Sequence, residues 1–441
     1  MPRRIVVIGG GAAGMSAASA ARRADSTAEV TVWEQGPFPS YGVCGLPYYL
    51  GGVISDPESL IAYPAAEFRE RRRIDLRLDS VITSVDLEAH LVVDSDGAEW
   101  GYDALVYAAG AQPIVPSIPG VDDPRVMTVR RLEDAIELRA RLGTARRGVI
   151  VGAGYVGLEM AEALHACGLD VTVMDRLSRV MTTVDPDVAA IIQTETERHC
   201  TLLLDAELRA LHSHDSHIDV EYDGGTIPTD VVVLAVGVSP STGLVSDLAA
   251  LPNGALIVDE QMRTSAEDVY AAGDCIAVHH RVLGEPAFVP LGPAANKTGR
   301  VAGTVAGGGE ATFAGVVGTA VVKVFDLTVA HTGVTLEEAR ARGWRAEATQ
   351  VTAKSRAKYY PGAEPIIVRL VHKPDGRVIG AQLVGRDGVA QRINVVAAAL
   401  QVGMTVDDIA ELDLAYAPPY SPVYDPLIQA AQAAVLARGR G

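Results

Sequence analysis

Cysteine is scarce in this chain, and its spacing excludes the commonest cysteine-based structural units. The 441 residues contain four cysteines, and no two of them form a Cys-x-x-Cys pair of the kind that structural zinc sites use. A framework of disulfides is not expected either, so the composition suits a reducing, cytoplasmic compartment. The ten histidines are scattered, and no metal site is predicted. The four cysteines are Cys44, Cys167, Cys200 and Cys275.

Basic charge and long hydrophobic runs are also in short supply. Lysine and arginine number 38 against 55 aspartates and glutamates, which gives a net charge of −17. A field of this sign repels nucleic acid and anionic membrane surfaces, so neither is an expected partner. No apolar run is long enough to cross a bilayer, and the apolar strand at residues 5–8 follows Met1 with no secretory leader before it. A phosphorylated ligand must therefore be held by local features.

Two glycine-rich turns repeat one pattern along the chain. Each lies between an apolar strand and a helix, and each is followed by an acid at the end of the next strand. The first glycine allows a tight turn, the second lets a pyrophosphate approach the backbone, and the third lets helix and strand pack closely. The helix N-terminus offers free N–H groups to the phosphates, and the distal acid binds ribose. The two units are Gly9, Gly11 and Gly14 with Glu34, and Gly152, Gly154 and Gly157 with Asp175.

These two units predict an α/β chain with two doubly wound, Rossmann-like nucleotide-binding domains. Two later strands, at residues 102–110 and 231–237, end in small residues that let the backbone run close beside a cofactor. A short strand then carries Asp274 at its tip. From about residue 319 the chain alternates strands and helices without a nucleotide fingerprint, which predicts a third domain of α+β character.

Together these features resemble the FAD- and NAD(P)H-dependent pyridine nucleotide–disulfide oxidoreductase family over essentially the whole chain. The resemblance implies an FAD-binding domain at residues 1–115 and 246–318, an inserted NAD(P)H-binding domain at 116–245, and an interface domain at 319–441 that forms a homodimer. It implies that Asp274 binds the ribityl hydroxyls, and that a helix begins at the flavin near residues 290–297. The implied FAD-binding residues are Gly9, Gly11, Gly14, Glu34, Gln35, Ala109, Gly110, Asp274, Ala294 and Ala295.

The second unit supplies the implied NAD(P)H-binding residues. Tyr155 resembles the family's aromatic gate over the flavin, and Glu159 is expected either to face the flavin N5 region or to cap its helix. Asp175 favours NADH because a carboxylate there repels a 2′-phosphate, whereas Arg176 and Arg179 leave NADPH open. The full set is Gly152, Gly154, Tyr155, Gly157, Glu159, Asp175 and Gly237.

Cys44 stands where members of this family carry a redox-active thiol that faces the flavin. A second cysteine usually follows five residues later, and here that residue is Tyr49. One thiol cannot cycle through an internal disulfide, so it must use a mixed disulfide, a persulfide or a sulfenic acid. The residues after Cys44 predict a helix start, and its N-terminus together with an oxidised flavin is expected to lower the thiol pKa.

Within the single-cysteine branch, the resemblance is greatest to the coenzyme A-disulfide reductases, so a small disulfide or persulfide containing coenzyme A is the expected substrate. Ala12 stands where the branch's oxidases and peroxidases usually have histidine, and Cys44-Gly45-Leu46-Pro47-Tyr48 resembles the Cys-x-x-Pro-Tyr pattern of the coenzyme A enzymes. Tyr360 and Tyr420 match tail motifs whose tyrosines reach the thiol site from the partner subunit, and one of them is expected to protonate the departing thiolate.

One residue departs from that branch, because Val43 stands where asparagine often precedes the cysteine. An acidic protein also needs a local basic site for the phosphates of coenzyme A. The residues expected to hold its nucleotide end are Arg22, Arg23, Ser40, Lys354 and Arg356.

Two other functions fit the same residues. The thiol enzyme could serve another acceptor, either a persulfide or polysulfide, or oxygen as in NADH oxidases. A flavoprotein of a different class would pass electrons to a protein partner, and Cys44 would then be incidental. Pocket shape decides between acceptors in a single-cysteine site, and the sequence does not display it.

Overall fold

A parallel sheet of five strands organises the N-terminal lobe. Every neighbouring pair is parallel, in the order β19-β7-β1-β2-β3, and the strands are β1 (Arg4–Ile8), β2 (Glu29–Trp33), β3 (Asp75–Arg77), β7 (Ala104–Tyr107) and β19 (Val269–Ala271). Strand β19 comes from far along the chain and closes one edge of this sheet. This computed structural model describes residues 1–439.

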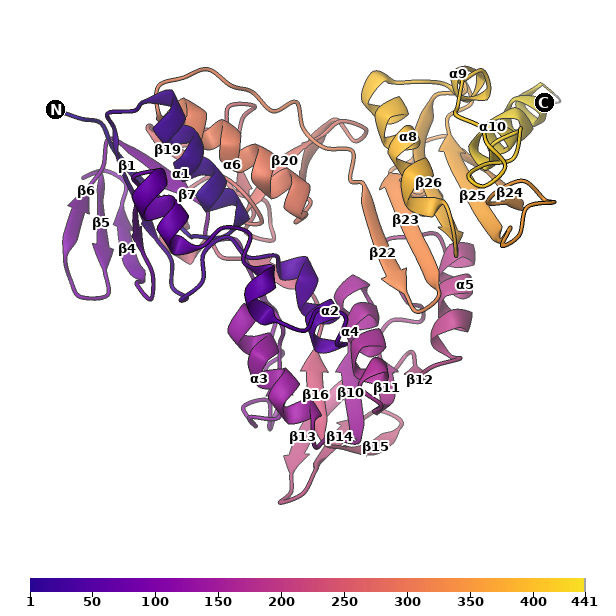
Figure 1. Cartoon of the computed structure of the whole chain (residues 1–441), viewed down its shortest axis with the longest axis horizontal. Helices are drawn as coiled ribbons and strands as arrows, with labels where there is room; N and C mark the ends of the chain where they lie inside the picture. Colours follow the sequence, from indigo (N-terminus) through magenta and orange to yellow (C-terminus); the bar gives the residue numbers. More distant parts are fainter. Residues whose placement is uncertain (440–441) are drawn as a thin grey trace.

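Two helices of small residues pack side by side on this sheet, α1 (Ala12–Ala24) and α6 (Gly292–Ala306) (Figure 1). Their backbones nearly touch, since a Cβ on Gly299 would lie 2.2 Å from the carbonyl oxygen of Ala13, and a Cβ on Gly303 would lie 1.9 Å from that of Ala17. The small residues of both segments are thereby explained by helix packing. This contact fixes the N-terminus of α6 against the first glycine loop.

A second parallel sheet forms the lower lobe of Figure 1. Its order is β12-β11-β10-β16-β9, and its strands are β9 (Val126–Met127), β10 (Arg147–Val151), β11 (Asp170–Met174), β12 (Thr201–Leu203) and β16 (Val231–Leu234). Three helices accompany it, α3 (Leu132–Leu142), α4 (Tyr155–Ala166) and α5 (Pro186–Thr196).

The C-terminal lobe is built on an antiparallel sheet. The order is β22-β23-β26-β25-β24, with β22 (Ala320–Val324), β23 (Leu327–Gly333), β24 (Glu347–Lys354), β25 (Pro365–His372) and β26 (Val378–Gly385). Its helices are α7 (Leu336–Ala341), α8 (Val389–Val402), α9 (Val406–Ala410) and α10 (Pro426–Arg438).

Smaller elements complete the lobes and the passages between them. Strand β8 (Ala111–Pro113) pairs with β17 (Val238–Pro240) where the chain crosses between the first two lobes, and the short helix α2 (Leu46–Leu50) lies against α3 and α4. Three small sheets contain β4 (Ile82–Asp86), β5 (Leu91–Asp94) and β6 (Glu99–Gly101); β13 (Leu208–Ser213), β14 (Ile218–Tyr222) and β15 (Gly225–Thr229); and β18 (Leu256–Ile257), β20 (Ile276–His280) and β21 (Glu285–Phe288).

The predicted fold class is confirmed, with two doubly wound units and an α+β C-terminal unit. The first sheet takes its strands from residues 4–107 and 269–271, whereas the second takes all of its strands from 126–234. These pairings support an insertion of the second unit into the first, and the domain limits themselves stay a prediction. Within residues 1–439, no helix is both long and apolar enough to cross a membrane.

Candidate active site

The three glycines of the first loop have different local surroundings, which explain differently why each position is glycine. Gly9 adopts φ +105°, and a Cβ there would lie 2.3 Å from the carbonyl oxygen of Ala108. A Cβ on Gly14 would lie 1.8 Å from the carbonyl oxygen of Gly9, so helix and strand pack only with glycine there. A Cβ on Gly11 would meet no protein atom within 4 Å. The first and third glycines serve the fold, and the second borders open space.

The open space at Gly11 suits an anion. Gly11 is the N-cap of α1, no side chain caps this helix, and its first turn carries no acid. The N–H groups of the first turn therefore stay available for phosphate oxygens, which is how nucleotide-binding loops use a helix N-terminus. Glu34 follows β2 and accepts hydrogen bonds from the backbone N–H of Gly10 at 2.6 Å and of Gly36 at 2.9 Å. Burial raises the pKa of Glu34 despite these bonds.

The second loop repeats this geometry in the lower lobe. Gly152 has φ +111°, and a Cβ there would lie 2.4 Å from the carbonyl oxygen of Ala235. A Cβ on Gly157 would lie 1.8 Å from the carbonyl oxygen of Gly152, whereas a Cβ on Gly154 would meet nothing within 4 Å. Helix α4 likewise has no side-chain cap and no acid in its first turn.

The acid of the second unit is held like that of the first. Asp175 follows β11 and accepts hydrogen bonds from the N–H of Ala153 at 2.7 Å and of Leu177 at 2.9 Å. Both loops therefore have the features of a dinucleotide site: an open helix N-terminus and an anchored acid at the end of the second strand. Gly237, with φ +117°, follows β16, at the point where the chain returns towards the first lobe.

A cavity of about 1450 Å³ lies along the first loop and reaches Cys44. Its volume exceeds the roughly 300–1000 Å³ of an ordinary small-molecule pocket, so it has room for a dinucleotide and a further ligand. Gly14 and Ala294 do not line it, in accord with packing roles. The predicted residues that do line it are Gly9, Gly11, Arg23, Glu34, Gln35, Ser40, Cys44, Ala109, Gly110, Asp274 and Ala295.

Cys44 is exposed to this cavity from a 3-10 turn, Val43–Gly45, that leads into α2. Burial and the carboxylates of Glu159 and Asp274 raise the pKa of the Cys44 thiol, and the Arg130 guanidinium acts in the opposite direction. The protein groups around the thiol therefore raise its pKa, whereas a lowering by the helix start together with an oxidised flavin stays a prediction.

Glu159 comes to the thiol from the second lobe. It lies one turn into α4, and burial together with the charge of Glu162 raises its pKa to about 7. The hydroxyl of Tyr48 in α2 hydrogen-bonds to Glu159, and burial raises the pKa of Tyr48 as well. Since the Glu159 carboxylate also acts on Cys44, the two predicted residues are brought together. A carboxyl group with a pKa near 7 can hold or release a proton at neutral pH.

Arg130 is a site residue that the sequence analysis missed. It lies between β9 and α3 and pairs with Asp274, with 2.7 Å from Nη2 to Oδ2. Both side chains line the cavity. The sequence signal is no more than the Arg130-Arg131 pair ahead of an expected helix, and arginine pairs are common at helix starts and surfaces. The ion pair fixes Asp274 where the first-lobe cavity meets the second lobe.

A group of cations lines the cavity beside α1 and α6. Arg23, Arg72, Lys297 and Arg300 all contribute to its wall, with Ser16, Ser19 and Asn296 between them. The Arg72 guanidinium lies over the rings of Tyr63 and Phe68 at 4.6 and 4.7 Å and donates to Ser19 Oγ at 2.9 Å. In an acidic protein, this group supplies the local positive charge that a phosphorylated ligand needs.

Only some of the residues predicted from sequence to hold the nucleotide end of coenzyme A line this cavity. Arg23 and Ser40 line the cavity, whereas Arg22 does not and instead donates to the backbone carbonyls of Ser26, Ala28 and Arg73. Lys354 and Arg356 lie in the C-terminal lobe, away from the cavity lining of their own chain. Arg356 pairs with Asp387 at 3.1 Å from Nε to Oδ2, and Lys354 donates to the carbonyl of Ala363 at 3.3 Å.

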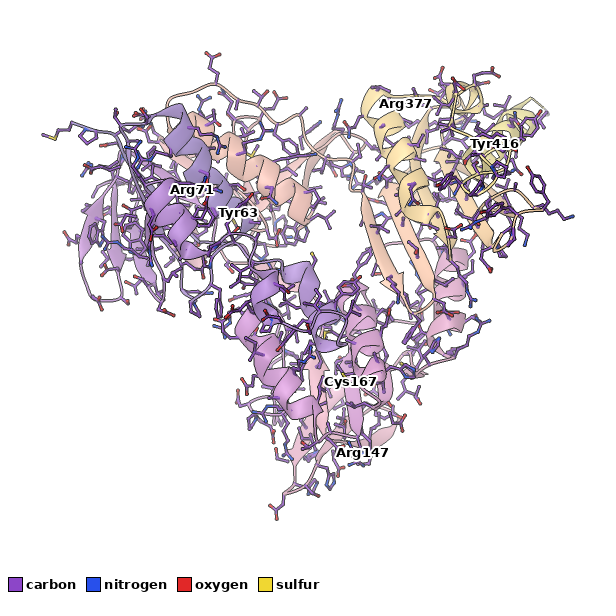
Figure 2. The ribbon with its side chains drawn as sticks, viewed as in Figure 1. Tyr63, Arg71, Arg147, Cys167, Arg377 and Tyr416 are labelled. Carbon is purple, nitrogen blue, oxygen red and sulfur yellow. The ribbon has the colours of Figure 1, made fainter. Side chains whose placement is uncertain are left out.

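Tyr360 and Tyr420 are exposed, with 37% and 79% of their surface accessible, and neither lines the cavity of its own chain. They lie near a pair formed by Tyr359 and Tyr416, whose hydroxyl oxygens are 3.3 Å apart. Figure 2 shows Tyr416 on the C-terminal lobe, well apart from Tyr63 on the N-terminal lobe. The chain therefore does not bring these tyrosines to its own Cys44, and a role at the partner's thiol stays a prediction.

Tyr155 begins α4 beside the second loop. Thr183 Oγ1 donates to its hydroxyl at 3.3 Å, and its ring centre lies 6.0 Å from that of His331 on β23 of the C-terminal lobe. Burial raises the pKa of Tyr155 to about 12, so the phenol stays protonated at neutral pH. The Tyr155 ring is thus held between the second and third lobes. Its role as a gate over the flavin remains a prediction.

Two dinucleotide-type loops, with a thiol in the cavity along the first of them, define a class of protein, the two-nucleotide redox enzymes that relay electrons to a sulfur group. Family comparison matches residues 3–298 to the pyridine nucleotide-disulphide oxidoreductase family and residues 319–427 to its dimerisation domain. The chain therefore belongs to the pyridine nucleotide-disulphide oxidoreductase family, and its cofactors are FAD and NAD(P)H.

Individual proteins similar to this chain have sulfur chemistry in their names. An NAD(P)H coenzyme A polysulfide/persulfide reductase of Pyrococcus horikoshii is 39% identical over 97% of each chain. A coenzyme A disulfide reductase of Staphylococcus epidermidis is 31% identical over 95% of this chain and 96% of its own length. The solved structure of reduced Bacillus anthracis CoADR-RHD matches with a TM-score of 0.96 and 34% identity, over 100% of this chain and 81% of that one.

Proposed function

We propose that this protein reduces coenzyme A disulfide with NAD(P)H through a mixed disulfide on Cys44. The overall reaction takes one NAD(P)H, one proton and one coenzyme A disulfide to NAD(P)+ and two coenzyme A thiols. The observation that carries the proposal is the position of Cys44, the one cysteine in the lining of a cavity that also borders the first glycine loop and a group of cations.

Individual residues of this chain have separate roles in the proposed reaction. The Cys44 thiolate attacks one sulfur of the substrate, the sulfur–sulfur bond breaks, and the first coenzyme A thiolate leaves and takes up a proton. Bound FAD supplies the two-electron transfer from NAD(P)H that reduces the mixed disulfide. The second coenzyme A thiol then leaves, and Cys44 returns to its starting state. Glu159, whose pKa is raised to about 7 and whose charge acts on Cys44, is proposed to exchange a proton at this site near neutral pH.

The first loop is proposed to hold FAD and the second NAD(P)H. Gly11 and Gly154 border open space at uncapped helix N-termini, and this fits two pyrophosphates. Glu34 and Asp175 accept backbone hydrogen bonds that orient their carboxylates towards each nucleotide site. We propose NADH as the preferred reductant, since Asp175 disfavours a 2′-phosphate.

The nucleotide end of coenzyme A is proposed to bind the cavity cations. Arg72, Lys297 and Arg300 join the predicted Arg23 in this site, because they line the cavity that contains Cys44 and the predicted Arg22, Lys354 and Arg356 do not. Arginine is suited to phosphate because its planar donors bind two oxygens at once.

We also propose a homodimer, on the basis of the dimerisation domain at residues 319–427. Tyr360 and Tyr420 then serve the partner's thiol site, since both are exposed and distant from the cavity of their own chain. A reducing cytoplasm fits the proposal, because Cys44 works as a free thiol.

A persulfide or polysulfide is the second candidate acceptor. The specific support is the 39% identity to the Pyrococcus horikoshii polysulfide/persulfide reductase over nearly the whole of both chains. With coenzyme A persulfide, one NADH and one proton would give coenzyme A thiol and hydrogen sulfide. Both reactions use Cys44 and the same nucleotide sites, so they differ only in the leaving group.

Anaerobic NADH consumption with each acceptor tests the proposal. With coenzyme A disulfide as sole acceptor we expect turnover in the wild type, loss of turnover in Cys44→Ser, and full turnover in Cys167→Ser. Cys167 is a matched control because it is also an exposed free cysteine but does not line the cavity. Turnover with persulfide alone would move the assignment to the second candidate, and activity retained in Cys44→Ser would refute both.

A further inference from the structure

Three of the ten histidines lie within six residues, at the turn between β13 and β14. The strands are antiparallel, with Ser213 opposite Ile218 and His212 opposite Asp219. The backbone N–H of His214 donates to the carbonyl of His217 at 2.9 Å and closes the turn. In Figure 1 this hairpin lies at the lower tip of the second lobe, far from the C-terminal lobe.

Alternation along the two strands separates polar from apolar side chains. Leu211, Ile218 and Val220 are buried and pack in a hydrophobic cluster under the hairpin. The residues between them, His212 and Asp219 among them, fall on the outer face, as the two-residue period of a strand requires. The hairpin thus has a fixed inner face and an outer face rich in imidazole and carboxylate.

On the outer face, two imidazoles contact the same carboxylate. Asp219 Oδ2 lies 3.1 Å from His214 Nε2, and Asp219 Oδ1 lies 3.3 Å from His217 Nε2. The two rings stack with their centres 4.6 Å apart and 15° between their planes. One ligand atom from each of the three residues lies within 4.8 Å of the others. Among the described residues 1–439, this is the group of three whose spacing could hold a metal ion.

We propose that His214, His217 and Asp219 bind a divalent transition-metal ion, with Zn2+ as the best-fitting ion. Zinc takes imidazole nitrogen and carboxylate oxygen at about 2.0–2.2 Å, so its ligand atoms lie about 3.4 Å apart in a tetrahedral site. Both imidazole–carboxylate distances already have this length. These two distances go to different oxygens of Asp219, so the stacked imidazoles must turn to point at one ion. Their side chains are 47% and 29% exposed, which leaves room for this rotation.

The surrounding backbone is held in place for such a site. The Arg125 guanidinium donates to the carbonyl of His214 at 3.1 Å, and Ser213 Oγ donates to Asp123 Oδ2 at 2.5 Å. Imidazole ligands select zinc, nickel or copper over calcium and magnesium. Three protein ligands leave a fourth position for water. None of the three lines the Cys44 cavity, so the proposed role of the ion is to stabilise the hairpin.

A Zn2+ titration of the FAD-loaded protein tests this site, with zinc measured after equilibrium dialysis. We expect the wild type to bind one more zinc per chain than His217→Ala and Asp219→Asn, and each variant to bind at least about tenfold more weakly at this site, the loss that even outer-shell changes cause. His212→Ala is the matched control. It lies on the same face, paired with Glu221 at 2.6 Å, and should retain the ion.

A second readout separates binding from misfolding. Zinc should raise the unfolding temperature of the wild type and of His212→Ala but not of His217→Ala, since a ligand of the folded state stabilises by mass action. Flavin content and reduction by NADH check that every variant is folded. Equal zinc binding in all four proteins would overturn the assignment. Loss of the ion in His212→Ala with retention in His217→Ala would overturn it as well.

Discussion

Replacing Gly154 with alanine should weaken NADH binding strongly without disturbing the fold. Gly154 is the N-cap of α4 with φ −83°, and an added Cβ would meet no protein atom within 4 Å. The backbone therefore accepts alanine, and the free energy of unfolding should fall by no more than about 1 kcal/mol, the usual range for an N-cap change. The methyl group would instead occupy the space that the pyrophosphate of NADH needs.

The expected loss of affinity follows from the hydrogen bonds at stake. A methyl group displaces the pyrophosphate from the first-turn N–H groups of α4, and a hydrogen bond to a charged group contributes about 1.5–3 kcal/mol. Weakening two such bonds without abolishing them gives a loss of about 2–3 kcal/mol, which is a rise of about 30- to 150-fold in the dissociation constant of NADH.

The assay is anaerobic stopped-flow reduction of the bound flavin at increasing NADH concentration. Flavin content and unfolding temperature should match the wild type. Gly152→Ala is the contrasting variant, because φ +111° and a carbonyl oxygen 2.4 Å from the new Cβ make it destabilising, by more than about 1 kcal/mol. Normal NADH affinity in Gly154→Ala, or unfolding of Gly154→Ala with a stable Gly152→Ala, would refute the assignment of roles to these glycines.

Three further predictions address the thiol, the reductant and the partner. Glu159→Gln should lower the pKa of Cys44, because it removes a carboxylate that raises it, and the pH midpoint for alkylation of Cys44 should move down; an unchanged midpoint would contradict this. Asp175→Ala should raise the KM for NADH and lower the KM for NADPH. Steady-state kinetics with both nucleotides measure these values, and unchanged KM values would contradict this role of the acid. Tyr420→Phe should slow disulfide reduction by about 100-fold or more, in line with the loss of one general acid, and leave flavin reduction by NADH unchanged. Equal slowing of both steps would place Tyr420 elsewhere in the mechanism.

Local pattern was enough to predict the two nucleotide loops. The first glycines have positive φ, the third glycines touch backbone, and the second glycines face open space, as spacing alone suggested. Each of these roles depends on residues within one strand, turn and helix, whose geometry the chain fixes locally. The same holds for the helix after Cys44 and for the short strand that precedes Asp274.

Long-range electrostatics could not be predicted in the same way. Arg130 meets Asp274 across 144 residues of sequence, and Glu159 acts on Cys44 from a different lobe. The effect of these distant acids on the Cys44 pKa was therefore missed when only neighbouring residues were considered. The same lesson applies to Arg22 and Arg23, which are adjacent in α1. A helix turns about 100° per residue, so one lines the cavity and the other binds backbone carbonyls.

The most direct test of the proposed mechanism is mass spectrometry of the protein after anaerobic mixing with coenzyme A disulfide in the absence of NADH. The first step needs no reductant, since the Cys44 thiolate displaces one coenzyme A thiolate and keeps the other half as a mixed disulfide. We expect one coenzyme A attached per chain, located at Cys44, with one free coenzyme A thiol released, and its removal on addition of NADH. A protein that stays unmodified while still consuming NADH with coenzyme A disulfide would contradict the account.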